Sequence, residues 1–182
     1  EYLRGVTHNG VGLFVAVGDD GNILTSSDNG TTWTSRTGTS DNLHSVTHGN
    51  NTFVVVGPGG VILTSTEGTT WDNRTSGTTN HLYGVTYGNS IFVGVGGSGQ
   101  IIRSTDNGTT WDNATSPSEN THYGVTFGND TFVAVGSNGS IVTSTDNGTT
   151  WDNATSGTTI GRGSISFGNN TFITGGGSVS IL

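Results

Sequence analysis

The sequence holds 182 residues, with 13 acidic residues against 5 basic ones, a formal net charge of -8 and no cysteine. An acidic chain with scattered Arg argues against nucleic-acid binding, because nucleic acids reward clustered Lys and Arg. The lack of cysteine excludes disulfides and thiolate metal sites. No apolar run approaches the roughly 20 residues of a membrane helix, so we expect no membrane span, and any signal peptide to have been removed already.

Apolar residues occur in short clusters at regular intervals along the sequence, although they make up only 29% of the chain. Each unit begins with a short strand that ends in Thr or Ser, expected at 5–7, 45–47, 84–86, 124–126 and 164–166. A second, more apolar strand that starts with Phe is expected at 14–17, 53–56, 92–95, 132–135 and 172–174. A third follows a Gly-containing turn, at 23–24, 62–63, 101–102, 141–142 and 181–182. The runs are β-branched, bounded by Gly and Asn, and without helical period, which predicts an all-β fold.

A stretch of seven or eight residues closes each of the first four units and ends in Trp. Its copies lie at 26–33, 65–71, 104–111 and 144–151, and the four Trp residues are spaced 38, 40 and 40 residues apart. The residue types suit a hairpin turn, because an Asp carboxylate accepts hydrogen bonds from turn amides and Gly tolerates positive φ. We expect Trp to start the fourth strand and these residues to fasten a turn without taking part in chemistry.

The pattern Ser-x-Asp-x-Gly-x-Thr-Trp resembles the Asp-box, or BNR repeat, of sialidase-type β-propellers. In that family the box joins the third and fourth strands of a blade, away from any active site, so the resemblance implies a fold rather than an activity. The second copy departs from it, with Glu67 in place of the Asp-Asn pair, and its turn is expected to be distorted. The structural positions are Ser26, Asp28, Gly30 and Trp33; Ser65, Glu67, Gly68 and Trp71; Ser104, Asp106, Gly108 and Trp111; and Ser144, Asp146, Gly148 and Trp151.

These observations predict one domain, a five-bladed β-propeller of four-stranded blades of about 40 residues each. The blades fall approximately at 1–41, 42–80, 81–120, 121–159 and 160–182, and the last is incomplete because the sequence stops where a fifth copy of the repeated stretch and the fourth strand after it would begin. Either that outer strand is simply absent, or another chain or a neighbouring domain supplies it by strand addition.

We assign no catalytic residue. The resemblance to sialidases implies a Tyr nucleophile paired with Glu, an Asp acid/base and Arg residues on the substrate carboxylate. We interpret the five Arg residues as lying at different blade positions, and Glu occurs only at positions 1, 67 and 119. A glycosidase is therefore a distant third hypothesis.

No cofactor or metal is expected either. His8 and His48 share a repeat position with Tyr87, Phe127 and Phe167, so they are interpreted as substitutes for aromatic rings rather than as metal ligands. Asp19-Asp20-Gly21 could hold Ca²⁺, but the corresponding turns of other units lack carboxylates, which favours an acidic hairpin.

Four residues are weak candidates for ligand binding. His44, Tyr83 and Tyr123 share one repeat position just before the first strand, and Arg4 holds that position in the first unit. The three rings could stack on sugars in a central funnel. The alternative is that they cap the core near the axis.

Ten Asn-x-Ser/Thr triplets could accept N-linked glycans, or could reflect only the use of Asn and Thr in turns and strand edges. They begin at Asn29, Asn50, Asn73, Asn107, Asn113, Asn129, Asn138, Asn147, Asn153 and Asn169. The sequence thus favours a non-catalytic extracellular or cell-surface module that binds glycans or surface proteins. The alternative is a structural subunit of an extracellular filament or surface layer, joined to copies of itself or to neighbouring domains by strand complementation at the edge of the last blade.

Overall fold

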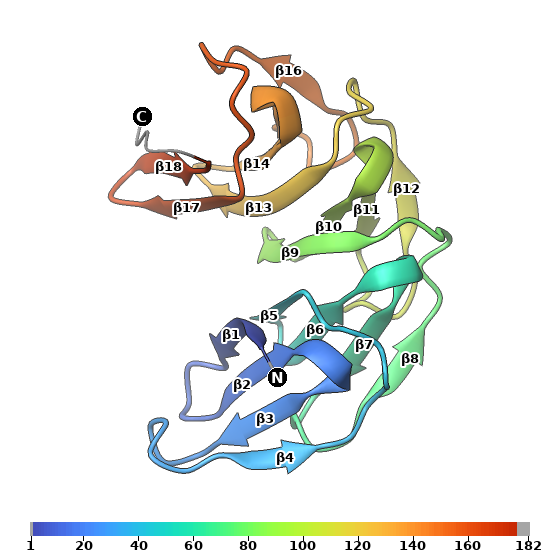
Figure 1. The fold of residues 1–182 in the computed structure, drawn as a ribbon, viewed down its shortest axis with the longest axis vertical. Coiled ribbons are helices and arrows are strands. Elements are labelled where there is room, and N and C mark those ends of the chain that lie inside the picture. Colours follow the sequence, from blue (N-terminus) through green and yellow to red (C-terminus); the bar gives the residue numbers. More distant parts are fainter. Residues whose placement is uncertain (1, 178–182) are drawn as a thin grey trace.

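The computed structural model describes residues 2–177, and they form strands joined by turns (Figure 1). The strands are β1 (Leu3–His8), β2 (Phe14–Gly18), β3 (Ile23–Ser26), β4 (Thr34–Arg36), β5 (Ser45–Gly49), β6 (Thr52–Val56), β7 (Ile62–Ser65), β8 (Asp72–Arg74), β9 (Leu82–Gly88), β10 (Ile91–Gly96), β11 (Ile101–Ser104), β12 (Asp112–Ala114), β13 (His122–Gly128), β14 (Thr131–Gly136), β15 (Ile141–Ser144), β16 (Asp152–Ala154), β17 (Ser164–Gly168) and β18 (Thr171–Gly175). Four single-turn 3₁₀ segments follow the second strand of the first four units: η1 (Asp19–Gly21), η2 (Pro58–Gly60), η3 (Gly97–Gly99) and η4 (Ser137–Gly139). None of the helical segments among residues 2–177 is long or apolar enough to cross a membrane.

Each unit folds into one antiparallel sheet whose strands pair in chain order, which confirms the predicted β-propeller architecture. Four sheets have four strands, and the last, β17–β18, has two among the described residues. The sheets follow one another in an arc, with β1–β4 at one end and β17–β18 at the other (Figure 1). The third strand predicted at 181–182 lies outside the described residues.

Successive blades pack face to face through apolar side chains. We call the face that meets the preceding blade the front face and the opposite one the back face. The back of blade 1 presents Val15 and Val17 to Phe53 and Val55 on the front of blade 2, and the same arrangement recurs between blades 2 and 3 and between blades 3 and 4. Because the residues of the second strand alternate between two packed faces, this strand is apolar throughout.

A ring packed on a glycine fixes how blades 3, 4 and 5 each sit on the blade before. The first strand of blades 2, 3 and 4 ends in Gly, and a ring of the following blade lies directly against that Gly. A Cβ added at Gly49, Gly88 or Gly128 would lie 2.0 Å, 2.1 Å or 2.2 Å from the Cγ of Tyr87, Phe127 or Phe167 respectively. Any side chain at these three positions would therefore push two blades apart.

Two interpretations from the sequence are corrected by the strand boundaries and the strand pairing. Each Trp lies one residue before the fourth strand, which starts at Thr34, Asp72, Asp112 or Asp152. Arg36 and Arg74 do not differ in blade position, because they pair with the equivalent residues Ile23 and Ile62 of the third strand.

Candidate functional site

A cavity of about 300 Å³ lies where the inner strands of all five blades converge. It is lined by the starts of β1, β5, β9, β13 and β17 or by the residue just before them. The strands approach closely here, since a Cβ at Gly84 would lie 3.0 Å from the carbonyl oxygen of Tyr123. A small residue at this repeat position, Gly or Ser, therefore lets the backbones gather around one space.

The structure brings all four predicted ligand-binding candidates to this cavity. Arg4, His44, Tyr83 and Tyr123 line its wall, each contributed by a different blade. They were candidates because they share one repeat position. Since equivalent positions of successive blades lie side by side around the cavity, residues far apart in the sequence become neighbours. Tyr123 is 40% exposed, so the row of side chains is open to a ligand from solvent.

Three of these side chains form a continuous aromatic row. The rings of His44 and Tyr83 stack at 5.2 Å with an interplanar angle of 13°, and those of Tyr83 and Tyr123 lie 5.4 Å apart at 58°. His44 Nδ1 is 2.9 Å from the carbonyl oxygen of Leu82. Because a carbonyl only accepts, Nδ1 carries the hydrogen, which leaves Nε2 as an acceptor when the ring is neutral. Planar surfaces of this kind suit stacking on peptide side chains or on the apolar faces of sugars.

Arg4 adds a cation beside the aromatic row. Its Nε donates to Asp19 Oδ1, and the hydrogen bond from Arg4 lowers the pKa of the Asp19 carboxyl below its usual range. This pairing also gives Asp19, the first residue of the acidic hairpin, a role in orienting Arg4. Among residues 2–177, no three His, Cys, Asp or Glu side chains gather into a group that could hold a metal ion.

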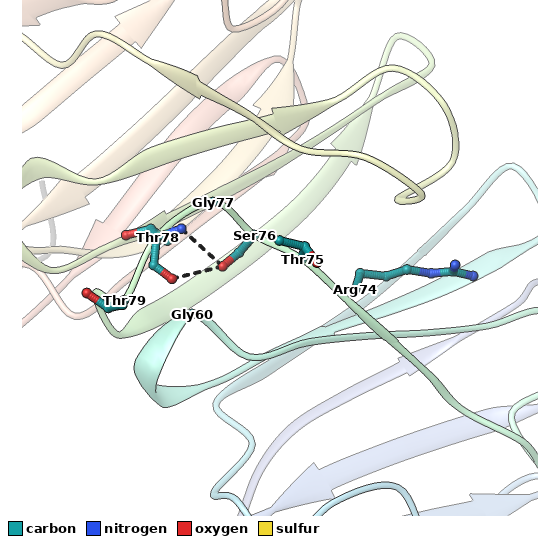
Figure 2. Close-up of a pocket in the computed structure, with 7 residues that line it drawn as sticks. All are labelled: Gly60, Arg74, Thr75, Ser76, Gly77, Thr78 and Thr79. Atoms are coloured by element: carbon teal, nitrogen blue, oxygen red, sulfur yellow. Dashed lines mark hydrogen bonds between the residues drawn. The ribbon is translucent and has the colours of Figure 1, made fainter.

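A larger cavity of about 600 Å³ lies on the outside of blade 2 and the loop after it (Figure 2). Its polar atoms bond to one another: Ser76 Oγ donates to the Thr78 carbonyl at 3.1 Å and accepts from the Thr78 amide at 3.4 Å. The same turn recurs at Ser116 and Ser156, so it is part of the blade connection rather than of a ligand site. Arg74 extends away from this loop (Figure 2).

The repeated turns are closed by their own side chains. In the last copy, Ser144 Oγ donates to Asp146 Oδ1 at 2.8 Å and accepts from the Gly148 amide at 2.9 Å. Asp146 Oδ1 also accepts from the Thr150 amide at 2.9 Å. Hydrogen bonds from the Thr150 hydroxyl and amide lower the pKa of Asp146 to about 2. Sequence reasoning on the turn assigned no partner to this Thr, although it recurs at the same place in every copy.

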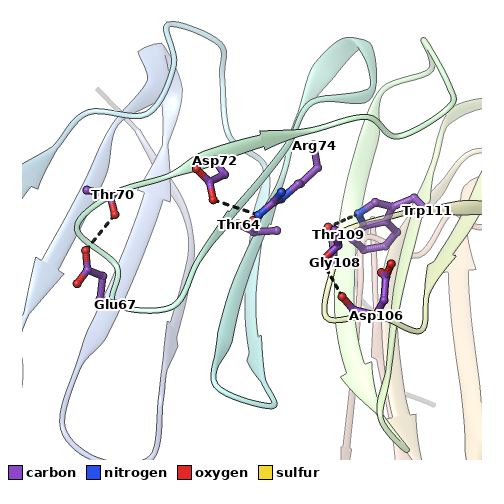
Figure 3. Close-up of polar contacts among 9 residues, drawn as sticks. All are labelled: Thr64, Glu67, Thr70, Asp72, Arg74, Asp106, Gly108, Thr109 and Trp111. Atoms are coloured by element: carbon purple, nitrogen blue, oxygen red, sulfur yellow. Dashed lines mark hydrogen bonds and ion pairs between the residues drawn. The ribbon is translucent and has the colours of Figure 1, made fainter.

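The second turn, which differs from the others in sequence, is closed by a different set of hydrogen bonds (Figure 3). Glu67 accepts from the hydroxyls of Thr69 and Thr70 at 2.6 and 3.0 Å, whereas Asp106 accepts from both the amide and the hydroxyl of Thr110. Gly68 keeps its positive φ of 72°. The second turn is therefore closed although it is one residue shorter than the other three.

Arg74 lies in the adjacent outer strand, where its Nε donates to Thr64 Oγ1 at 2.8 Å and its Nη2 to Asp72 at 3.1 Å (Figure 3). Arg36 makes the equivalent bond to Thr25. Both guanidinium groups thus tie the fourth strand to the third, far along the blade from the central cavity.

His8 and His48 occupy aromatic positions, as the repeat predicted. Their rings lie 5.5 and 4.5 Å from Phe14 and Phe53, and Tyr87 and Phe127 contact Phe92 and Phe132 in the same way. Burial lowers the pKa of His48, with a smaller contribution from His8. Both imidazoles therefore make the ring contact of the repeat, the His48 ring in a half-buried position and the His8 ring on the exposed face of blade 1.

The ten asparagines of the possible glycosylation triplets fall into two groups. Seven of them adopt positive φ in turns: Asn29, Asn50, Asn107, Asn129, Asn138, Asn147 and Asn169. Asn is well tolerated in that conformation, which accounts for its presence there without any glycan. Asn73, Asn113 and Asn153 instead lie exposed in the outermost strands β8, β12 and β16.

Comparison with known protein families identifies the family of this chain. A model of the DUF6242 beta propeller domain matches residues 3–122. The chain belongs to this family. The match spans the first three blades, including Arg4 and Tyr83 in the inner strands β1 and β9 and His44 just before β5. No curated protein matches this DUF6242 propeller significantly in sequence.

Solved structures share the fold of this DUF6242 propeller at low sequence identity. A structure of YCF48 bound to D1 peptide superposes with a TM-score of 0.75 at 18% identity, and the match covers 94% of this chain and 59% of that one. YCF48 from Cyanidioschyzon merolae gives 0.73 at 18%, covering 94% and 63%. An ancestral GH74 enzyme gives 0.66 at 21%, covering 82% and 23%. The DUF6242 propeller therefore spans about three fifths of the length of the two YCF48 chains.

Proposed function

We propose that this chain is a non-catalytic binding module that holds a segment of a partner protein, or a glycan, in its central cavity. The observation that carries the proposal is the convergence of Arg4, His44, Tyr83 and Tyr123 from four blades on one cavity of about 300 Å³. Tyr and Arg are among the residue types that most often carry the affinity at protein interfaces. YCF48, which has the same fold, has been solved with D1 peptide bound, and this favours a peptide over a glycan as the ligand.

The absence of catalysis is part of the same proposal. Glu67, one of three Glu residues in the chain, is engaged by Thr69 and Thr70 in an outer turn. Four of the five Arg residues lie in three different parts of the molecule. Arg4 lies at the central cavity, Arg36 and Arg74 lie in outer strands, and Arg162 is buried. Retaining glycoside hydrolysis needs a nucleophile and an acid/base a few ångströms apart on one sugar ring. A fluorogenic sialoside should therefore remain intact in the presence of the chain.

As part of this proposal, the repeated turns are Asp-box turns. Their Ser, Asp, Gly and Thr hydrogen bonds join residues of the same turn, so they would stabilise the module without touching a ligand. An extracellular or cell-surface location is the accompanying proposal, supported by the three exposed outer-strand triplets at Asn73, Asn113 and Asn153. Secretion from a eukaryotic host followed by enzymatic deglycosylation would test it, with a loss of mass expected at those three sites.

The binding proposal is tested by selecting ligands without assuming their identity. A displayed random-peptide library and a glycan array are screened against the chain, and the best binder from each is measured by calorimetry. Tyr83→Ala and Tyr123→Ala should each weaken the selected peptide about tenfold or more, because each removes stacking area at the centre of the site. Tyr2→Ala is the matched control, since Tyr2 is 76% exposed and does not line the cavity. Unchanged affinity in the Tyr83/Tyr123 double variant, or the lack of any binder, would contradict the proposal.

A further inference from the structure

The hairpin turn between β1 and β2 differs in sequence from the corresponding turns of the other blades. Residues 9–13 read Asn-Gly-Val-Gly-Leu, whereas blades 2 and 3 have only the pairs 50–51 and 89–90 between their first two strands. Those two pairs are exposed, although blades 2 and 3 each have a blade on both sides. A turn at this place of the repeat is therefore open to water whichever blade carries it.

The first two residues of this turn, Asn9 and Gly10, lie among hydrogen bonds that suit one reaction. The Gly10 amide donates to Nδ1 of His8 at 2.9 Å. Oδ1 of Asn9 accepts from the amides of Val11 and Leu13, each at 3.0 Å. The Asn9 amide donates to the Leu13 carbonyl oxygen, also at 3.0 Å, and closes the turn. The turn thus holds a nitrogen beside a base, and a side-chain carbonyl beside two donors.

These contacts assign a role to each group. Because a backbone amide only donates, Nδ1 of His8 presents its lone pair, and a neutral ring carries its hydrogen on Nε2. An imidazole nitrogen in this state is a general base within reach of the Gly10 proton. The two amides on Asn9 Oδ1 draw electrons from Cγ and stabilise the negative charge that this oxygen gains when a nucleophile adds to Cγ. Gly10 has no side chain to hinder the approach of its nitrogen.

We propose that Asn9 is a site of self-modification, where the side chain cyclises with Gly10 to a succinimide that is hydrolysed to aspartate or isoaspartate. His8 Nδ1 takes the amide proton as the Gly10 nitrogen bonds to Asn9 Cγ. The Cγ–Nδ2 bond then breaks, and Nδ2 leaves as ammonia with the proton that His8 returns. Water opens the ring at Cγ to give aspartate, or at the backbone carbonyl carbon to give isoaspartate. One water is consumed and one ammonia is released, and no atom is oxidised or reduced.

The reaction needs no ligand and no partner, so it is independent of the proposed binding function. Either product adds one negative charge to the β1–β2 turn. Isoaspartate also carries the backbone through Cβ and Cγ, which lengthens the turn by one carbon atom. The modification therefore changes both the charge and the backbone of this hairpin.

Three other Asn–Gly pairs lie in the repeated turns and are held differently. Their Gly amides donate to a Ser hydroxyl at 2.9 Å in each case, at Gly30, Gly108 and Gly148. A hydroxyl is a far weaker base than an imidazole at neutral pH. Oδ1 of Asn107 and Asn147 also accepts from the side-chain amide of Asn50 or Asn89 in the neighbouring blade, at 2.6 Å. These pairs are therefore expected to persist while Asn9 converts.

The test follows the folded chain over time at neutral pH, with peptic digestion and mass spectrometry of the peptides. Conversion of each Asn is read from the mass gain of amide-to-acid exchange, and isoaspartate from enzymatic methylation. Asn9 should convert at least about tenfold faster than Asn29, Asn107 and Asn147 in the same sample. Equal or slower conversion at Asn9 would overturn the proposal. This comparison uses the wild-type chain alone, so it does not depend on the folding of a variant.

A pair of matched variants tests the base. His8→Phe removes the imidazole and keeps a ring, as Phe127 does in blade 4, and conversion at Asn9 should slow at least about tenfold. His48→Phe makes the same change at the equivalent position of blade 2 and should leave the Asn9 rate unchanged. In urea, where the turn is lost, wild type and His8→Phe should convert Asn9 at equal rates. Equal rates in the two folded chains, or a difference that persists in urea, would contradict the role of the folded turn.

Discussion

His122 takes a place in blade 4 that Leu43 and Leu82 take in blades 2 and 3. It pairs with Gly136 as Leu82 pairs with Gly96, and it is fully buried. Its Nε2 lies 3.4 Å from Ser140 Oγ, and no described group bonds to its Nδ1. Burial lowers the pKa of His122 to about 4, so the side chain is neutral in the folded protein at neutral pH.

This histidine makes folding sensitive to mild acid. The unfolded chain binds the proton with an ordinary pKa near 6.5 while the folded chain resists it down to about 4. Stability is therefore complete above pH 6.5 and falls as the pH drops from 6.5 to 4, by up to about 3 kcal/mol. His122→Leu should abolish most of that loss, measured by urea unfolding at pH 7 and at pH 4.5.

The turn carboxylates act in a lower pH range and do not obscure this effect. Hydrogen bonds, first of all from the Thr32 hydroxyl, lower the pKa of Asp28 to about 2, and Asp146 behaves alike. Their contribution is present above the ordinary carboxyl pKa near 4 and is lost only below it. An exposed histidine variant, His8→Phe, serves as the control, and equal acid sensitivity in His122→Leu and wild type would contradict the assignment.

At the scale of the element, four near-identical turns deliver their Trp side chains into different surroundings. Each indole donates to the carbonyl of the turn Gly, at 3.0 Å in both Trp33 and Trp111. Local geometry is thus the same in both, but the preceding blade covers Trp111 and no described blade covers Trp33. The contribution of the side chain to stability depends on that neighbour.

Truncating the two Trp residues should therefore give unequal losses. Trp111→Ala should lower the free energy of unfolding by about 3 to 5 kcal/mol, as expected for a buried aromatic side chain. Trp33→Ala should cost less than about 2 kcal/mol, because much of its indole already contacts water. Urea unfolding of both variants in dilute solution measures the difference, and equal losses would show that the indole acts mainly within its own turn.

The strands and the turn residues could be predicted because their causes are local. Alternation of apolar side chains, Gly with positive φ and the Ser–Asp pair all lie within a few residues of one another. The equivalence of Arg36 and Arg74 could have been predicted too, since each lies three residues after the Trp of its unit, and their pairing with Ile23 and Ile62 shows it directly. For the central cavity, the repeat position identified Tyr83 and Tyr123, but their stacking across blades needed the structure.

For the whole molecule, the number of covered faces sets how firmly each sheet is held. Blade 3 packs between two neighbours, whereas β17–β18 packs against blade 4 through one face among the described residues. Sequence alone gives all five units the same apolar pattern, so it could not distinguish covered faces from uncovered ones. Burial is decided by which blades stand beside each sheet.

Backbone amides should report this difference directly. Local opening requires less free energy where fewer apolar contacts are lost. Amides of β17 and β18 should therefore exchange with deuterium about tenfold or more faster than those of β9 and β10, measured by mass spectrometry in dilute solution. Uniform protection along the arc would mean that the blades open only together. Sites in β13 and β14 provide the intermediate reference.

The ring-on-glycine contact also determines how such a chain can lengthen. The units that contain Tyr87 and Phe127 carry both parts of the joint: a ring for the unit before and a glycine, Gly88 or Gly128, for the unit after, whereas the first unit has Asn9 at the glycine position. Duplicating or deleting one of these two units in the gene preserves each joint, while a change of half a unit separates a ring from its glycine. Blade number can therefore vary among descendants of one ancestral repeat, while the spacing within the repeat stays fixed.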